Sequence, residues 1–393
     1  MLKLTVPGSV RISPLTIERP TIVKITTNRD FPTALRERAG LLIEDLATDC
    51  PSGFQFVLAR KVSRPDLVPA ANVLAIGADL HYLSDGDVIR VLPNARITTL
   101  YRRAARANAL LVTERCNSFC VMCSQPPRDI NDDHLIDEYL EAIPLFDRST
   151  PEIGITGGEP TLLGNRLFRL LQALKSYLPE TAVHILSNGR NCRDLALAQR
   201  FSALEHPDLM LGIPLYSDIP SIHDFVVQAD GAYDETLRGI LNLKRCGVRV
   251  EIRVVIHRHT YARLPALARF ISRNLQFVDH VALMGLELMG FAKSNIDDLW
   301  IDPADYQPEL REATQTLSRA RIRTSIYNHQ LCVIDPEIRR FAVKSISEWK
   351  NEYMPECEGC ASMADCGGFF SSALLRRSVH IKPIIRNTVA GAM

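Results

Sequence analysis

The protein's 393 residues are 46% hydrophobic and 23% charged, a composition typical of soluble globular proteins. This length allows two or three domains. The 46 Lys and Arg residues nearly balance the 45 Asp and Glu residues, so the formal net charge is +1. That balance excludes the strongly basic surface of a bulk nucleic-acid binder, and we expect no nucleic-acid partner.

Two features indicate a protein that does not enter a membrane. No stretch approaches the roughly 20 uninterrupted apolar residues that a membrane helix needs. The N-terminal segment contains Lys3, Pro7 and Gly8 and lacks the apolar core of a signal peptide. We therefore expect a cytoplasmic protein, in which thiols stay reduced and clustered cysteines more often bind metal than form disulfides.

Residues 1–105 contain short alternating runs that are typical of strands, and one helical stretch over residues 32–47. Runs at 87–91 and 96–100 flank Leu92-Pro93-Asn94, which predicts a hairpin. We expect these residues to form a small α+β domain.

Residues 106–302 alternate between apolar runs and segments with apolar residues at helical spacing, such as 167–178 and 233–245. The predicted strands are residues 109–113, 152–156, 182–187, 209–215, 248–256 and 281–286. Strands that alternate with helices imply right-handed crossovers and a parallel sheet. A closed eight-unit barrel takes about 250 residues, so this region predicts a partial (β/α)6 barrel.

The remaining residues, 303–393, are expected to form a C-terminal extension. It begins with a predicted helix to about residue 320 and a strand over residues 321–327, followed by a loop-like tail that contains cysteines.

Three cysteines follow the first predicted barrel strand: Cys116, Cys120 and Cys123. Three thiolates on one tight loop can hold three irons of a cubane and leave the fourth iron without a protein ligand. Zinc is the alternative, but a closed structural zinc site needs four ligands, and only His134 lies nearby. Parallel barrels carry their chemistry at the carboxyl ends of the strands, where this loop is expected.

The other cysteines form a second group and three isolated residues. Cys332, Cys357, Cys360 and Cys366 supply the four ligands that close either an iron–sulfur cluster or a zinc site. The isolated residues Cys50, Cys192 and Cys246 are interpreted as packing residues.

The CxxxCxxC loop and the run Gly157-Gly158-Glu159-Pro160 after the second strand resemble the radical S-adenosylmethionine (SAM) enzymes, over about residues 108–290. The resemblance implies that the three loop cysteines ligate a [4Fe–4S] cluster whose open iron is chelated by SAM. It also implies that backbone at Gly157 and Gly158 approaches the methionine moiety and that Glu159 pairs with its ammonium group.

Further SAM contacts follow from position in the family. The resemblance places Ser187 and Asn188 near the ribose, Ser217 and Arg253 near the carboxylate, and residues 286–289 on the adenine. His223, His257 and His259 lie in βα loops, where histidines are more often structural hydrogen-bond partners. No catalytic side chain is assigned.

The tail cysteines resemble the C-terminal auxiliary-cluster extension of SPASM or twitch type. The chain lacks the cysteines for two auxiliary clusters, so one auxiliary [4Fe–4S] cluster is expected, and zinc remains an alternative. The segments CNSFCVMCSQPP, EIGITGGEPTLLG and WKNEYMPECEGC are most similar to the radical SAM maturase of the His-Xaa-Ser peptide-modification system.

This similarity implies an enzyme that cleaves SAM reductively to a 5′-deoxyadenosyl radical and modifies a ribosomally made peptide by hydrogen abstraction. The implied partners are the precursor peptide, a partner radical SAM maturase and a low-potential electron donor. The alternatives are a radical SAM enzyme that acts on a small molecule in cofactor biosynthesis and a non-enzymatic zinc-binding adaptor. Residues 1–105 could bind the leader peptide or close the bottom of the barrel.

Overall fold

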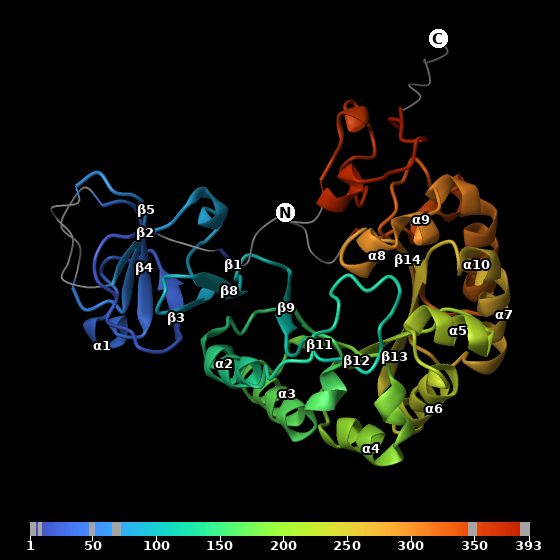
Figure 1. Cartoon of the computed structure of the whole chain (residues 1–393), viewed down its shortest axis with the longest axis horizontal. Coiled ribbons are helices and arrows are strands. Elements are labelled where there is room, and N and C mark those ends of the chain that lie inside the picture. Colours follow the sequence, from blue (N-terminus) through green and yellow to red (C-terminus); the bar gives the residue numbers. More distant parts are fainter. Residues whose placement is uncertain (1–4, 7–9, 47–51, 65–71, 345–351, 386–393) are drawn as a thin grey trace, which may run out of the picture.

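The computed structural model describes residues 5–6, 10–46, 52–64, 72–344 and 352–385. Its strands form two sheets, one of eight strands in the N-terminal part and one of seven strands in the central part. The cysteine-rich tail lies beside α8 (Phe291–Ser294) and α9 (Ile296–Leu299), at one end of the central sheet (Figure 1).

The N-terminal sheet has the strand order β1-β8-β7-β3-β4-β5-β6-β2. Its strands are β1 (Thr5–Val6), β2 (Val10–Arg11), β3 (Thr21–Thr26), β4 (Ala39–Asp45), β5 (Phe56–Lys61), β6 (Val73–Ala75), β7 (Val88–Val91) and β8 (Ile97–Tyr101). Strands β3 to β6 pair in parallel, whereas β7 pairs antiparallel with β8 and β3. Apolar clusters cover both faces, because Phe56 and Leu58 belong to one buried cluster and Val57 and Ala59 to another.

Strands β4, β7 and β8 test two predictions for this region. The helix predicted over residues 32–47 is wrong, because α1 covers only Thr33–Arg36 and β4 follows it. The first five residues of β4 are all buried, and a strand buried on both faces lacks the alternation that separates strand from helix. The predicted hairpin is confirmed by the antiparallel pairing of β7 with β8.

The central sheet is parallel throughout, with the strand order β15-β14-β13-β12-β11-β10-β9. Its strands are β9 (Ala107–Leu111), β10 (Glu152–Thr156), β11 (Ala182–Leu186), β12 (Leu209–Pro214), β13 (Arg249–Ile256), β14 (His280–Gly285) and β15 (Thr324–Tyr327). The sheet curls into a half-barrel, and its helices lie along the outer side (Figure 1). The longer helices are α2 (His134–Ala142), α3 (Asn165–Tyr177), α4 (Leu195–Ala203), α5 (Pro220–Val227), α6 (Ala232–Arg245), α7 (Leu264–Asn274) and α10 (Gln307–Arg319).

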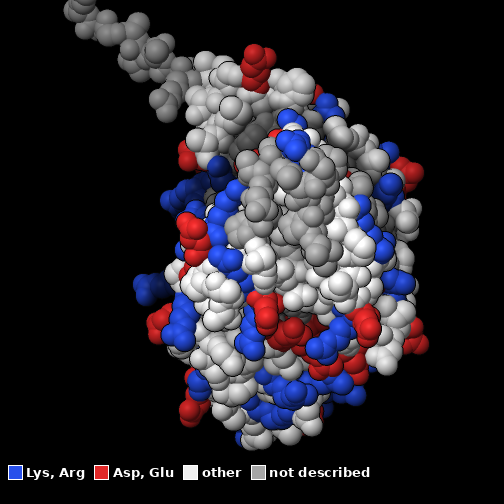
Figure 2. Space-filling view, turned by 90° about the vertical axis from the view of Figure 1, so that its left-hand side faces the viewer, with Lys and Arg blue, Asp and Glu red and all other residues white. Residues whose placement is uncertain are grey.

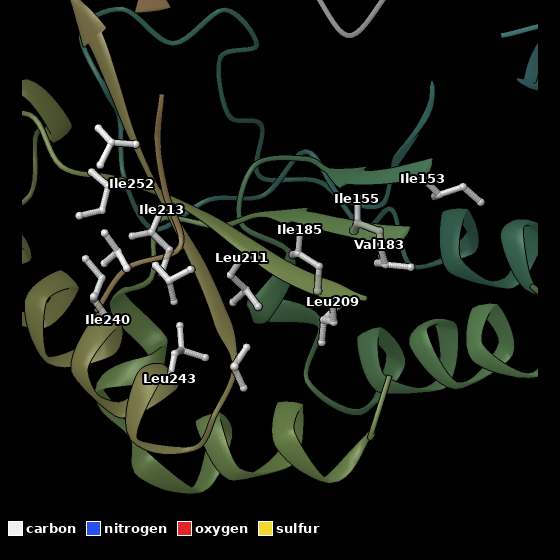
Figure 3. Packing of buried hydrophobic residues seen from close by; sticks show 14 of the residues in the cluster. Ile153, Ile155, Val183, Ile185, Leu209, Leu211, Ile213, Ile240, Leu243 and Ile252 are labelled. Carbon is white, nitrogen blue, oxygen red and sulfur yellow. The ribbon is translucent and has the colours of Figure 1, made fainter. Parts of the chain in front are cut away.

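Alternate residues of the barrel strands build the core between sheet and helices. Ile185 and Leu211 point toward the helical layer, where Ile240 and Leu243 of α6 meet the sheet (Figure 3). All four side chains are fully buried. Since side chains alternate along a strand, the residues between them face the concave side of the half-barrel.

The six predicted barrel strands are all present, and the partial barrel is confirmed. The strand predicted over residues 321–327 is also present, as β15, and it joins the same sheet beside β14. The predicted boundary at 105 falls between β8 and β9, whereas the boundary at 302 separates β15 from its sheet. We therefore propose that the barrel extends to Tyr327.

Acidic and basic side chains occur in small neighbouring groups on the face of the molecule that Figure 2 shows. Neither sign dominates this face, in keeping with the net charge of +1. None of the helices in the described parts of the chain has the length and apolar character that crossing a bilayer requires.

Truncation of one core side chain should weaken the half-barrel measurably. Leu211 is fully buried, so Leu211→Ala removes apolar contacts and leaves a cavity. We expect the free energy of unfolding to fall by about 2–5 kcal/mol in a chemical denaturation series. Leu241 on α6 is 49% exposed. The control Leu241→Ala should therefore change the free energy of unfolding by less than about 0.5 kcal/mol. Equal losses in both variants would contradict this packing.

Candidate functional site

The first cysteine group lies on a long loop between β9 and α2. Burial, reinforced by the neighbouring thiols of Cys123 and Cys116, raises the pKa of Cys120 to about 12. Burial is also the main cause that raises the pKa of Cys116 to about 11, with Glu159 and Cys123 adding to it. The loop therefore gathers three protonated thiols within electrostatic reach of one another. They must lose protons when they bind a metal.

The number of these thiols suits a cluster with one open iron. Within the described residues, no three His, Cys, Asp or Glu side chains are arranged as ligands of one metal ion. In a cubane each thiolate binds a different iron, so three thiols leave one iron without a protein ligand. The three-thiol loop fits a [4Fe–4S] cluster with one open iron.

Asp132 lies at the C-terminal end of the cysteine loop and contacts residues at its N-terminal end. Its buried carboxylate accepts hydrogen bonds from Thr113 Oγ1 (3.0 Å) and Glu114 N (2.5 Å), and it pairs with Arg115 Nε at 3.2 Å. These contacts join the two ends of the cysteine loop.

Two further elements hold the middle of the loop. Phe119 N and Val121 N donate to carbonyl oxygens at the end of α5, at 3.1 and 2.9 Å. Phe291 N donates to Cys123 O at 2.8 Å, next to Gly290, whose φ is +52°. A Cβ at Gly290 would lie 2.5 Å from Cys123 O, so this contact requires glycine.

Gly157 and Gly158 pack directly against the cysteine loop. Gly158 N donates to Thr113 O and Glu159 N donates to Arg115 O, each at 2.8 Å. A Cβ at Gly157 would lie 2.5 Å from Thr113 O, and one at Gly158 would lie 2.0 Å from Arg115 O. The contact between the loops thus requires residues without side chains at both positions. The approach of their backbone to the methionine moiety stays a prediction.

Glu159 is fully buried and braces two loops. One carboxylate oxygen accepts from Thr161 N (3.0 Å), Thr161 Oγ1 (2.5 Å) and Ser187 Oγ (2.8 Å), and the other accepts from Asn188 N (2.6 Å). Burial raises the pKa of this carboxyl, and the four hydrogen bonds oppose that rise. Both oxygens are engaged within the protein, so the described contacts favour a positioning role. Pairing with the SAM ammonium stays a prediction.

Ser187 and Asn188 directly follow the third barrel strand, β11, and lie beside Glu159. Ser187 is buried and accepts from Gly189 N at 3.1 Å, in addition to its bond to Glu159. Asn188 Nδ2 donates to Asn117 Oδ1 at 2.6 Å and thereby reaches the cysteine loop. The structure therefore brings both residues to the candidate site.

Ser217 and Arg253 are less clearly part of this arrangement. Ser217 is fully buried and accepts from Ile219 N at 3.1 Å, as in a turn before α5. Arg253 Nη1 pairs with Glu251 at 2.6 Å, and Nη2 lies 3.2 Å from Met284 Sδ. Arg253 thus already has an anionic partner within the barrel, and its contact with a SAM carboxylate stays a prediction.

The predicted adenine segment and the loop histidines have structural contacts. Leu286 packs in an apolar cluster that also contains Met122 of the cysteine loop. His223 Nδ1 accepts from Tyr216 N at 3.3 Å, and His257 Nδ1 accepts from His259 N at 3.3 Å. These bonds agree with the structural interpretation of the histidines.

The tail cysteines form a second candidate metal centre. Burial and the nearby thiols of Cys366 and Cys357 raise the pKa of Cys332. Cys360 N donates to Cys357 O at 3.1 Å. Backbone N–H groups also face sulfur: Ile384 N lies 3.4 Å from Cys360 Sγ, and Leu331 N lies 3.4 Å from Cys366 Sγ. Such donors suit thiolates that carry negative charge on a metal.

The isolated cysteines fall partly in the core. Cys192 is fully buried in the main apolar cluster, and Cys246 packs against it. Cys50 lies outside the described residues.

Sequence reasoning did not identify two residues that shape the site, Asp132 and Arg190. Arg190 follows Ser187-Asn188-Gly189 directly and donates through Nη1 to Asn117 O and to Ser118 Oγ (3.1 Å). Its position after a strand-end motif was a usable signal. Asp132 lies in a polar stretch of Asn and Asp residues that offered none.

Residues 110–271 match the family model described as the Radical SAM superfamily. These residues are a radical SAM domain. Members of this superfamily use a [4Fe–4S] cluster and SAM as cofactors, and the chemistry of the three-thiol loop fits both.

Two curated relatives match parts of this chain. One is the Fe-coproporphyrin III synthase of Methanosarcina barkeri, 28% identical over 160 residues, which are 40% of this chain and 38% of that protein. The other is the pyruvate formate-lyase-activating enzyme of Staphylococcus aureus, 32% identical over 114 residues, which are 26% of this chain and 44% of that protein. The chain thus spans less than half the length of either relative.

A crystal structure of Streptococcus suis SuiB bound to S-adenosylmethionine is also similar to this chain. It has 15% sequence identity and a TM-score of 0.49, and the alignment covers 60% of this chain and 53% of SuiB.

A side chain added at Gly158 should disturb the cluster loop. Gly158→Ala forces Cβ toward Arg115 O, so either the loop or the second strand end must shift. We expect the variant to keep much less iron than the wild type after anaerobic reconstitution, by chemical iron analysis. A Cβ at Gly77 would meet no atom within 4 Å, which makes Gly77→Ala a matched control. Full iron content in Gly158→Ala would contradict this packing argument.

Proposed function

We propose that the protein is a radical SAM enzyme that modifies a ribosomally made peptide by hydrogen abstraction. The observation that carries the proposal is the loop with Cys116, Cys120 and Cys123, held against Gly158 and Asn188 at the ends of two neighbouring strands. When bound and reduced, the cluster supplies one electron that cleaves SAM to methionine and a 5′-deoxyadenosyl radical.

The chain's own residues position this chemistry. Asp132 joins the two ends of the loop, and Gly290 and Phe291 hold its middle at Cys123. Glu159 fixes the ends of β10 and β11 relative to each other through its bonds to Ser187 and Asn188. A site that is ordered before the cofactor binds has less conformational entropy to lose on binding.

We also propose that Cys332, Cys357, Cys360 and Cys366 bind one auxiliary [4Fe–4S] cluster. Its support is the number of thiols and the backbone N–H groups that face two of the sulfur atoms. Cys332 follows β15 closely, so this centre would be anchored to the edge of the barrel.

The peptide substrate is supported by the similarity of three sequence segments to the maturase of the His-Xaa-Ser system. The proposed partners are the precursor peptide, a second radical SAM maturase and a low-potential electron donor. A pocket between the barrel edge and the tail, lined by Leu286, Trp300, Phe369 and Arg376, is the proposed entrance for the peptide.

A small-molecule substrate is the second candidate. The observation that favours it is the activity for which one relative is named, that of an Fe-coproporphyrin III synthase.

The loss of one loop thiol should abolish SAM cleavage. Cys120→Ala leaves two ligands, too few to hold the open cluster. With dithionite as reductant, we expect the wild type to release 5′-deoxyadenosine and the variant to release none, by liquid chromatography. Cys246→Ala, a packing cysteine, is the control and should behave as the wild type. Release of 5′-deoxyadenosine by anaerobic Cys120→Ala would contradict the ligand assignment.

The same assay separates the two substrate classes. A synthetic peptide with His-Xaa-Ser repeats should increase 5′-deoxyadenosine release and change in mass. An increase with iron coproporphyrin III alone, and an unchanged peptide, would favour the small molecule.

Metal analysis of a tail variant tests the auxiliary centre. Anaerobically reconstituted wild type should contain about eight iron atoms, four for each cubane. Cys357→Ala should lose about four of them and retain SAM cleavage without substrate, because the loop cluster is intact. Loss of zinc instead of iron would overturn the auxiliary iron–sulfur cluster.

A further inference from the structure

We propose that Arg190 is a positioning residue that holds the cluster loop and supplies a fixed positive charge beside it, and that Glu235 on α6 moderates this charge. The inference rests on the proposed ligation of the cluster by Cys116, Cys120 and Cys123.

Arg190 grips the stretch of loop between the first two cysteines. Its Nη1 donates to the carbonyl oxygen of Asn117 and to Ser118 Oγ, the latter at 3.1 Å. Asn188 holds the same stretch through the side chain of Asn117, at 2.6 Å. Charge-assisted bonds from a planar guanidinium fix direction as well as distance. Rotation of this stretch would therefore break several bonds at once.

The guanidinium is itself held from the other side. Arg190 Nε donates to Glu235 Oε2 at 2.7 Å, and the second oxygen of Glu235 pairs with Arg193. The side chains of Arg190 and Glu235 are only 14% and 21% exposed, so solvent screens this pair less than a surface ion pair.

Two glycines allow this approach of loop, turn and helix. Gly189 has a φ of +76°, a conformation that glycine adopts without strain, and it turns the chain into Arg190. Gly239 of α6 packs on that turn, and a Cβ there would lie 2.1 Å from Gly189 O. Helix α6 therefore lies close enough to bring Glu235 to Arg190.

The charge of Arg190 acts on the cluster site as well as on the loop. The guanidinium of Arg190 contacts Asn117 and Ser118, which lie between Cys116 and Cys120 in the chain. A cubane on three thiolates becomes more negative by one charge when it is reduced, and a nearby fixed cation favours the more negative state. Removal of the cation should therefore make reduction harder. Removal of the negative charge of Glu235 should make it easier.

A purely structural role of Arg190 predicts different shifts of the cluster's reduction potential. If Arg190 acted only as a brace, Arg190→Gln and Glu235→Gln would both loosen the loop and would shift the potential in the same direction or leave it unchanged. Variants of opposite sign therefore separate the electrostatic effect from the bracing effect.

The test uses the full chain, reconstituted anaerobically, with Arg190→Gln, Arg190→Lys and Glu235→Gln. The midpoint potential is measured by a redox titration followed by electron paramagnetic resonance, and the loop cluster is identified by its spectral change on addition of SAM. We expect Arg190→Gln to lower the reduction equilibrium about tenfold, equivalent to about 59 mV for a one-electron couple. Glu235→Gln should shift the potential in the positive direction, and Arg190→Lys should stay near the wild type.

Amide hydrogen exchange in the metal-free protein gives an independent readout. Amide exchange of residues 117–123 should be faster in Arg190→Gln and in Arg190→Lys. Neither side chain has the guanidinium that bonds Asn117, Ser118 and Glu235 at once, although lysine keeps the positive charge. Arg193→Gln is the matched control: Arg193 pairs with the same Glu235 and has no described contact with the loop, so loop exchange should be unchanged.

Three outcomes decide the proposal. Opposite shifts for Arg190→Gln and Glu235→Gln, together with faster loop exchange in Arg190→Gln, support it. Shifts of equal sign, no shift, or unchanged loop exchange overturn it. If the wild type forms no SAM-responsive cluster, the proposed ligand set fails, and the charge effect of Arg190 on the cluster fails with it; the exchange measurement still decides whether Arg190 holds the loop.

Discussion

Backbone contact between two loops is the constraint on which the candidate site depends. At Gly158 the cysteine loop comes so close that no side chain fits between the two main chains. This contact gives two backbone N–H groups acceptors in the cysteine loop and leaves Glu159 buried behind it. The carboxylate then requires partners, which Thr161, Ser187 and Asn188 supply. The positions of the thiols relative to two strand ends are thus set largely by the main chain.

The concave side of the half-barrel differs sharply from its helical side. Strand β11 buries Ile185 against the helices and places His184 on the other face, and β13 does the same with Ile252 and Glu251. Burial alone would raise the pKa of Glu251, but the hydrogen bond from His280 (2.6 Å) and the charge of Arg253 bring it to about 2. This carboxylate holds Arg253 in place and explains why Arg253 is already paired. The concave side of the half-barrel is therefore polar around Glu251, and its charged groups are paired with one another.

Much of the barrel and the location of the site could be predicted from the sequence, because strand runs and strand-end motifs are local signals. The cysteine spacing and the Gly157-Gly158-Glu159 run are of this kind. What those residues contact is set by long-range packing, and this is why the roles predicted for Glu159 and Arg253 did not foresee their protein partners. Strand β4 was mistaken for part of a helix because both its faces are buried. Arg190 directly follows a strand-end motif and could have been singled out, whereas Asp132 acts through bonds to loop groups that no sequence pattern records.

The segment after β15 has a consequence for the open edge of the central sheet. Among the described strands, β15 has a sheet neighbour on one side only, and unpaired strand edges invite pairing with other chains. Val343 N donates to Ile326 O at 2.9 Å, and a parallel bridge joins Ile326 to Ala342. Cys366 Sγ in turn accepts from Leu331 N, so the cysteine-rich tail is also held close to the end of β15. Residues 342–343 thereby occupy part of the edge of β15 that would otherwise be open to pairing with another chain.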